Sequence, residues 1–259
     1  TTANATSVVY QAGNTSDCVD VIEAWDGDAM FGRAYLNVIG PAEVAKAGKA
    51  VIIAGTKGGE DTLWPATEYL ANNAYNVLLY RGYSKDNIRY LSQDVGVDVD
   101  GNGSPDDVDL VATSTNVQPT FASWAGGVGK LFVYLVDHGG STGTSGYFRL
   151  NSGELLDGVQ LDGWLDDIQN TYTTEVTVVM DFCNAQSVAL DLTYTGAATR
   201  IVIASSDTNE SAYFLANGLV SFSDAFFGGI LMGQDVVTAY GQAQTAMADY
   251  QQAIYTDNG

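Results

Sequence analysis

The chain has 259 residues, of which 46% are hydrophobic and 16% are charged. This composition fits a globular protein of one or two domains and excludes an intrinsically disordered chain. With 31 acidic and 10 basic residues the net charge is -21, which argues against nucleic acid or anionic membrane surfaces as partners. The sequence has no apolar run long enough to span a bilayer, so we expect no membrane insertion. Two cysteines are too few for a disulfide-based scaffold.

The first 48 residues differ in pattern from the rest. Short apolar stretches at 8–10 and 18–22 are separated by Gly, Asn, Thr and Ser, which favour turns. We therefore predict a small β-rich N-terminal extension over 1–48 and one domain over 49–259. The start at Thr1 lacks the charged and apolar regions of a signal peptide, so we expect a mature form or an excised domain. The acidic, glycine-rich composition suggests an exported protein, secreted or at the cell surface of a bacterium or archaeon.

From residue 49 onward, short apolar runs alternate with longer segments of helical type. The predicted strands are 50–54, 88–91, 131–136, 176–180 and 200–204. The predicted helices lie near 64–82, 117–126, 159–170 and 184–191, with two more after 218. This alternation predicts an α/β fold of three layers, in which helices cover both faces of a mostly parallel sheet of five or six strands.

Two of these strands end in residues suited to nucleophilic catalysis. His138, the only histidine, follows one strand, and Cys183 follows the next. An imidazole can stabilise a thiolate nucleophile or take its proton, and parallel strands gather such groups at their carboxyl edge. Gly139 leaves room for a backbone N–H to approach an oxyanion. The alternative is that neither residue is catalytic: His138 would be a hydrogen-bonded histidine at a strand end, and Cys183 a small buried side chain.

The two strand ends, LFVYLVDHGG at 131–140 and VTVVMDFCNAQS at 176–187, resemble the caspase and hemoglobinase superfamily of cysteine peptidases (clan CD). The spacing between His138 and Cys183, and an opening strand that ends in Ala-Gly, are similar to its legumain branch. The resemblance implies a caspase-like fold with Cys183 as nucleophile and His138 as acid and base. It also implies an oxyanion hole from the N–H groups of Gly139 and Cys183. Peptide or protein substrates would be hydrolysed through a thioester.

The resemblance also points to a substrate pocket. Legumains carry an Arg-His pair after the first strand, where this chain has Leu63-Trp64. The residues at pocket positions are Trp64, Asp181, Ser205, Ser206 and Asp207. An acidic pocket favours Arg or Lys at P1, the residue before the scissile bond. The alternatives are asparaginyl specificity of the legumain type and, for Asp207, a role in a solvated turn.

The loop from Asp98 to Asp109 matches the spacing of an EF-hand calcium loop, with Asp in place of the final Glu. The oxygen donors of this template are Asp98, Asp100, Asn102, Ser104, Asp106 and Asp109. Ca²⁺ prefers six to eight oxygen ligands, which one short loop of this spacing can supply. No flanking EF-hand helices are indicated, so we expect an isolated, structural calcium site. The alternative is an acidic, glycine-rich turn without metal.

Three functions are therefore open. The first is an exported, calcium-stabilised cysteine endopeptidase. The second is a catalytically silent relative that serves as a calcium-dependent binding or surface module. In the third, Cys18 and Cys183 form a disulfide, which leaves no nucleophile. The sequence does not indicate an oligomeric state.

Overall fold

The computed structural model describes residues 18–26, 29–38, 48–59, 61–143 and 145–258, and before residue 48 only the backbone of two strands. These strands, β1 (Cys18–Asp26) and β2 (Ala29–Val38), pair antiparallel as a hairpin. The predicted apolar stretch at 8–10 lies outside the described residues. The division of the chain at residue 48 stays a prediction.

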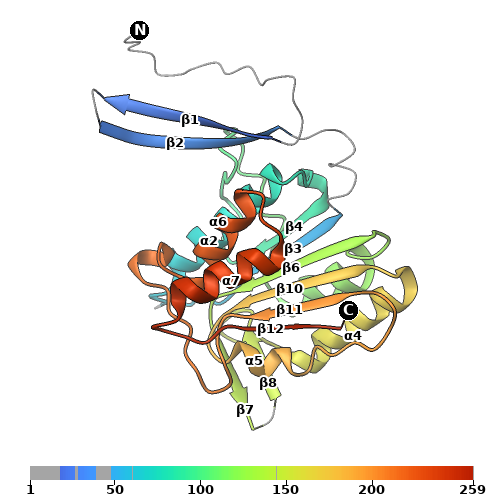
Figure 1. The fold of residues 1–259 in the computed structure, drawn as a ribbon. Coiled ribbons are helices and arrows are strands. Elements are labelled where there is room, and N and C mark those ends of the chain that lie inside the picture. Colours follow the sequence, from blue (N-terminus) through green and yellow to red (C-terminus); the bar gives the residue numbers. More distant parts are fainter. Residues whose placement is uncertain (1–17, 27–28, 39–47, 60, 144, 259) are drawn as a thin grey trace.

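The centre of the domain is a seven-stranded sheet in the order β12-β11-β10-β6-β3-β4-β5 (Figure 1). Its strands are β3 (Lys49–Ala54), β4 (Ile88–Ser92), β5 (Leu110–Val111), β6 (Lys130–Val136), β10 (Glu175–Asp181), β11 (Arg200–Ala204) and β12 (Ile254–Asp257). All pairs are parallel except β11 with β12. The five predicted strands are confirmed, and the sheet has one or two strands more than expected. The additional strands β5 and β12 are short and lie at the edges, where a partly exposed strand needs no continuous apolar run.

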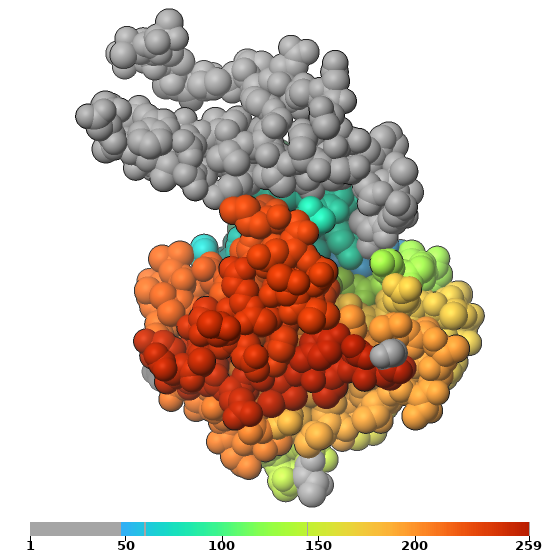
Figure 2. All heavy atoms as spheres, in the orientation of Figure 1, coloured from blue at the N-terminus to red at the C-terminus, as the bar shows by residue number. Residues whose placement is uncertain are grey.

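Helices cover both faces of this sheet, so the predicted three-layer α/β/α architecture is confirmed. One face carries α2 (Trp64–Tyr80), α6 (Phe222–Leu231) and α7 (Val236–Met247). The other carries α3 (Ser114–Pro119), η2 (Thr120–Trp124), α4 (Gly158–Tyr172) and α5 (Ala185–Ala189). The part of the chain that the structure describes also has two short 3-10 turns, η1 (Lys85–Asn87) and η3 (Ala216–Gly218). Figure 2 shows the last part of the chain, in orange and red, covering much of the face turned to the viewer.

The central strands are apolar along their whole length because both faces of the sheet are covered. In β6, every residue after Lys130 is buried, and the neighbouring β3 and β10 are similarly apolar. Alternate side chains enter two separate cores: Val133 and Leu135 pack on the α4 side, and Tyr134 and Val136 on the α2 side. This packing fixes the register of β3, β6 and β10 and with it the positions of their carboxyl ends.

A second, three-stranded sheet was not expected from the sequence. It consists of β7 (Gly139–Thr142), β8 (Ser145–Arg149) and β9 (Leu155–Asp157), paired antiparallel in that order. The sheet continues directly from β6, and its strand β8 packs against α4 and α5. Phe148 of β8 meets Phe182 after β10, with ring centroids 5.2 Å apart. The small sheet therefore covers the carboxyl edge of the main sheet on the α4 and α5 side.

Candidate functional site

His138 and Cys183 occupy equivalent places at the carboxyl ends of two neighbouring strands. In the parallel register of β6 and β10, Val136 pairs with Asp181. The N–H of Asp137 donates to the carbonyl of Asp181 at 3.4 Å, which continues the pairing by one residue. His138 and Cys183 come next on the two chains, each two residues beyond the paired positions. The structure thus places the two predicted residues on adjacent chain segments at one edge of the sheet.

Gly139 allows these two segments to approach each other. A Cβ atom at this position would lie 2.1 Å from Cδ2 of Phe182, the residue before the cysteine. No side chain can be accommodated at that distance, so position 139 requires glycine. Its predicted oxyanion role stays a prediction, as does that of the Cys183 N–H, which precedes α5.

Two carboxylates face the imidazole of His138, which is half-exposed. Oδ1 of Asp61 lies 3.4 Å from Nε2 of His138, and Oδ1 of Asp137 lies 3.8 Å from the same nitrogen. Both carboxylates are almost completely buried, whereas 43% of the His138 side chain is exposed. The backbone N–H groups of Leu63 and Lys57 donate to Oδ1 and Oδ2 of Asp61, at 3.0 and 2.8 Å. Asp61 is therefore a fixed negative group at the Nε2 side of the ring.

Asp137 is held in the same region by α2. Its Oδ2 accepts a hydrogen bond from Thr67 Oγ1 at 2.6 Å, and its Oδ1 accepts one from the N–H of His138. Burial raises the pKa of Asp137 to about 6, against the lowering effect of hydrogen bonds from the Thr56 and Thr67 side chains and of the nearby His138. The donor atoms of Asp61, Asp137 and His138 lie within 4.8 Å of one another, a spacing that could also hold a metal ion.

The turn that carries Cys183 is held by a buried serine from the next strand end. The Ser206 hydroxyl donates to the carbonyl of Phe182 at 2.8 Å and accepts from the N–H of Ala185 at 3.1 Å. Asn184, between these two contacts, has φ of +62° and turns the chain into α5. Cys183 itself is half-buried and is a free thiol. The Cys18–Cys183 disulfide considered from the sequence is therefore not formed.

Asp181 is a completely buried carboxylate on the α2 and α6 side of the sheet. Its Oδ2 accepts hydrogen bonds from the hydroxyl and the N–H of Ser223, at 2.6 and 3.0 Å. Its Oδ1 and the hydroxyl of buried Ser205 make no well-formed hydrogen bond among the described residues, although Ser205 lies close enough to the carboxyl to lower its pKa. Burial has the larger effect and raises the pKa of Asp181. Asp181 and Ser205 thus form a buried polar pair close to the cysteine strand end.

The other two predicted pocket residues have local structural contacts. Oδ1 of Asp207 accepts from the N–H and the hydroxyl of Thr208, at 2.6 and 3.2 Å. These are the contacts expected for the turn alternative. Trp64 is buried at the start of α2, and Nζ of Lys57 lies 5.1 Å from the centroid of its ring. The roles of Trp64 and Asp207 in substrate binding stay predictions.

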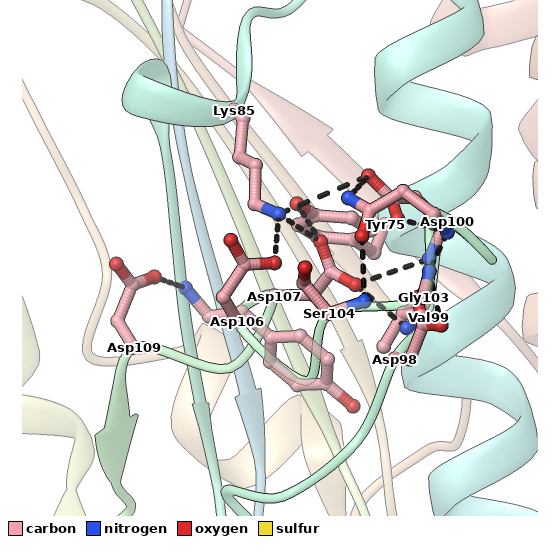
Figure 3. Close-up of polar contacts among 12 residues, drawn as sticks. Tyr75, Lys85, Asp98, Val99, Asp100, Gly103, Ser104, Asp106, Asp107 and Asp109 are labelled. Atoms are coloured by element: carbon pink, nitrogen blue, oxygen red, sulfur yellow. Dashed lines mark hydrogen bonds and ion pairs between the residues drawn. The ribbon is translucent and has the colours of Figure 1, made fainter.

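The acidic loop folds back on its first aspartate, as Figure 3 shows. The N–H groups of Asn102 and Gly103 donate to the two carboxylate oxygens of Asp98, at 3.1 and 2.8 Å. Asn102 also donates to Asp100 through its backbone and its side chain, and its own Oδ1 accepts from the N–H of Ser104. The first half of the loop is therefore a tight turn around carboxylate oxygens.

The second half of the loop differs from the EF-hand template. Asp109 faces β4, where it accepts from the N–H of Tyr90 at 2.8 Å, and Asp106 pairs with Lys85 at 2.5 Å. Buried Asp107 comes close to Asp98 and Asp100 instead, with donor oxygens of all three within 4.8 Å. These oxygens suit a hard cation such as Ca²⁺. The ammonium group of Lys85, 2.7 Å from Asp107, already neutralises one side of the cluster (Figure 3).

Sequence reasoning did not identify Asp61, Asp107 or Arg149. Asp61 follows the first strand by several residues, and no motif marks it. Asp107 directly follows the template position Asp106, and its burial distinguishes it from that residue. Arg149 ends β8 in a sheet that was not predicted. The one signal in the sequence that could have identified Arg149 is its position as a basic residue shortly after the histidine motif in a strongly acidic chain.

Comparisons with known proteins agree on the fold. The structure is similar to the crystal structure of the Drosophila initiator caspase Dronc, with a TM-score of 0.54 and 10% sequence identity over 82% of this chain and 80% of that one. It is also similar to caspase-1 from Spodoptera frugiperda, with a TM-score of 0.53 and 11% identity over 82% and 86% of the two chains. The chain has a caspase-like fold. No family model and no curated protein matches the sequence.

This caspase-like fold confirms the architecture implied by the sequence resemblance. The similarity is to caspases, and the finer assignment to the legumain branch stays a prediction. Among the described residues, no helix combines the length and the apolar character that crossing a membrane requires.

Proposed function

We propose that the chain is a cysteine peptidase that hydrolyses peptides or proteins, with Cys183 as nucleophile and His138 as acid and base. The observation that carries this proposal is the parallel pairing of β6 with β10. This pairing brings the single histidine and a free thiol to the carboxyl ends of two neighbouring strands. The caspase-like fold supports it, because the proposed nucleophile lies at the carboxyl edge of a parallel sheet, where such folds place reactive groups.

The contacts of His138 indicate which of its two ring nitrogens takes the proton of the thiol. Nε2 faces Asp61, a fixed hydrogen-bond acceptor, so the proton of the neutral ring belongs on Nε2. Nδ1 then remains free to take the thiol proton. We infer that Asp61 is a positioning residue, which orients the ring and stabilises the imidazolium that forms during the reaction.

The reaction follows from these positions. The Cys183 sulfur attacks the scissile carbonyl carbon while its proton moves to His138, and the oxygen takes the negative charge of a tetrahedral intermediate. When the C–N bond breaks, His138 returns the proton to the leaving amine and a thioester remains on Cys183. His138 next removes a proton from a water molecule, which attacks the thioester. The acid product leaves and the thiol is regenerated.

For the acyl side of the substrate we propose a preference for Arg or Lys at P1. Asp181 supplies a buried carboxylate with the Ser205 hydroxyl beside it, and neither its Oδ1 nor this hydroxyl makes a well-formed hydrogen bond among the described residues. An ammonium or guanidinium group would satisfy these atoms and would compensate the burial of the carboxylate. The legumain-type alternative, an asparagine at P1, lacks the positive charge for this interaction.

The decisive experiment is peptide hydrolysis by wild type, Cys183→Ala, His138→Ala and Cys18→Ala. We expect hydrolysis by wild type and Cys18→Ala, and none by the other two, with all four proteins folded by circular dichroism. Activity that survives in Cys183→Ala would refute the nucleophile and favour other chemistry at the Asp61, Asp137 and His138 group. A folded wild type without any peptidase activity would favour the silent binding module.

We further propose that the acidic loop binds one structural calcium ion through Asp98, Asp100 and Asp107. Support comes from the convergence of their carboxylate oxygens and from the turn that Asn102 and Gly103 make around Asp98. The ion would connect the loop to α2, because Asp107 also accepts a hydrogen bond from Tyr75 at 2.9 Å. Its role in this position is structural, away from the thiol.

A further inference from the structure

An open pocket of about 390 Å³ lies beside His138, on the side where the small sheet covers the main one. It is lined by Thr56, His138, Gly139, Arg149 and Ser152. These residues come from the turn after β3, the end of β6, the start of β7, the end of β8 and the following turn. The pocket therefore shares the imidazole with the proposed catalytic site.

Arg149 is fixed in this pocket by its backbone. Its N–H donates to the carbonyl of His138 at 2.9 Å, and its carbonyl accepts from the Thr56 hydroxyl at 3.3 Å. A Cβ atom at Gly55 would lie 2.2 Å from that carbonyl oxygen, so the end of β3 is packed directly against the Arg149 backbone. The backbone of a half-buried arginine is thus held beside the backbone of His138, and the two residues line the same pocket.

The guanidinium group of Arg149 has no ion pair among the described residues. Five other cations pair with carboxylates: Lys57, Lys85, Arg89, Lys130 and Arg200. In a chain with 31 acidic and 10 basic residues, an unpaired guanidinium in a pocket is available for a negative group of a ligand. Arginine suits a carboxylate in particular, because its planar fork can donate two parallel hydrogen bonds.

The two flanks of the site differ in their ionisable groups. Asp137 and Asp181 are buried on the flank formed by α2 and α6, where they bind Thr67 and Ser223. Arg149 lies on the other flank, in β8, which packs against α4 and α5. The proposed site therefore has buried carboxyl groups on one flank and an unpaired guanidinium group on the other.

The chemistry of the reaction decides which part of the substrate meets Arg149. His138 must donate its proton to the leaving amine, so the leaving-group side of the scissile bond lies at the imidazole. We propose that Arg149 binds a carboxylate on this leaving-group side, either an acidic side chain close to the scissile bond or the C-terminal carboxylate of a short leaving peptide. The inference rests on the proposed peptidase function and adds a specificity-determining residue to it.

The test compares matched peptides with the same P1 arginine. One pair carries Glu or Gln as the first residue after the scissile bond, and a second pair has two residues after that bond and ends in a free carboxylate or an amide. For wild type we expect kcat/KM to be at least about tenfold higher with the negative member of one pair, mainly through a lower KM. The pair that shows the preference identifies the source of the carboxylate.

Three variants assign the effect. Arg149→Ala should bring the ratio within the preferred pair to about one, and Arg149→Lys should keep part of it, because lysine retains the charge but loses the fork. Arg81→Ala is the matched control, since Arg81 directly follows α2 and has no ion pair among the described residues. It should leave the ratio as in wild type. Thermal melting of the four proteins separates loss of the ratio from loss of folding.

The contrary outcomes are distinct. If wild type cleaves the peptides but shows no preference in either pair, the inference is wrong and the peptidase function stands. A preference for an acidic residue at P1 that disappears in Arg149→Ala would place Arg149 on the acyl side and overturn the assignment. If no peptide is cleaved by folded wild type, both the function and the inference fall.

Discussion

Oδ1 of Asp61 lies 3.4 Å from Nε2 of His138, one of the two ring nitrogens of the imidazole proposed as acid and base. Asp61 belongs to the connection between β3 and α2, and His138 to the end of β6. Because β3 and β6 are neighbours in the sheet, their carboxyl ends are adjacent. The contact gives the proposed dyad a third, orienting member.

Asp61→Asn should lower kcat by about tenfold or more with little change in KM, because the imidazolium loses its negative neighbour while the substrate contacts remain. The pH profile of kcat should also change, which a purely structural role of Asp61 does not predict. Steady-state kinetics across a pH series measure both effects. Asp249→Asn, at an exposed position, serves as the control. Unchanged kcat and pH profile in Asp61→Asn would contradict the positioning role.

Wild type should prefer Arg or Lys over Asn or Asp at P1 by about ten- to a hundredfold in kcat/KM, through a charge-assisted hydrogen bond to Asp181. Asp181→Asn should remove most of this preference, and Asp207→Asn should retain it, since Asp207 is engaged with Thr208. A set of fluorogenic peptides that differ only at P1 measures this. A clear preference for Asn would support legumain-type specificity, and one for Asp would exclude the acidic pocket.

Calcium should raise the melting temperature by several degrees over protein in EDTA, because a ligand that binds only the folded state stabilises it. Asp98→Ala combined with Asp100→Ala should abolish the increase, and Asp107→Ala should do the same. Differential scanning calorimetry with and without calcium makes the measurement, with Asp249→Ala as control. If calcium does not change the melting temperature of wild type, the calcium proposal is wrong. The loop is then an acidic turn in which Lys85 alone neutralises the carboxylates.

The stability of the protein should depend on pH through Asp137. Burial raises the pKa of this carboxyl in the folded protein to about 6, whereas an aspartate in an unfolded chain titrates near pH 4. Between about pH 4 and pH 6 the folded state binds more protons at Asp137 than the unfolded state, so its contribution to stability falls as pH rises.

Asp137→Asn removes this titration. The variant should therefore gain stability relative to wild type as pH increases from about 4 to about 7, while other carboxylates affect both proteins alike. Urea unfolding of both proteins across this range gives the difference in free energy at each pH. A difference that stays constant would show that Asp137 titrates at its ordinary pKa in the folded protein.

The sequence by itself determined the five inner strands of the central sheet and the two residues proposed for catalysis. Strands such as 131–136 and 176–180 are continuous apolar runs, because both of their faces are covered, and this pattern is visible in the sequence. In a parallel sheet the strands end at a common edge. His138 and Cys183, which follow these runs after one and two intervening residues, could therefore be predicted to lie together.

Only the tertiary structure decided which groups surround that pair. Asp61 lies near His138 in the turn after β3, and Arg149 lies near it at the end of β8, in the small sheet that was not predicted. Both positions depend on strand pairing, of β3 with β6 and of β7 with β8, and not on a periodic pattern in the local sequence. In the acidic loop, burial against α2 turns Asp107 toward Asp98, while pairing of the chain with β4 turns Asp109 away. Side-chain direction outside regular strands follows such long-range contacts, which local sequence patterns do not encode.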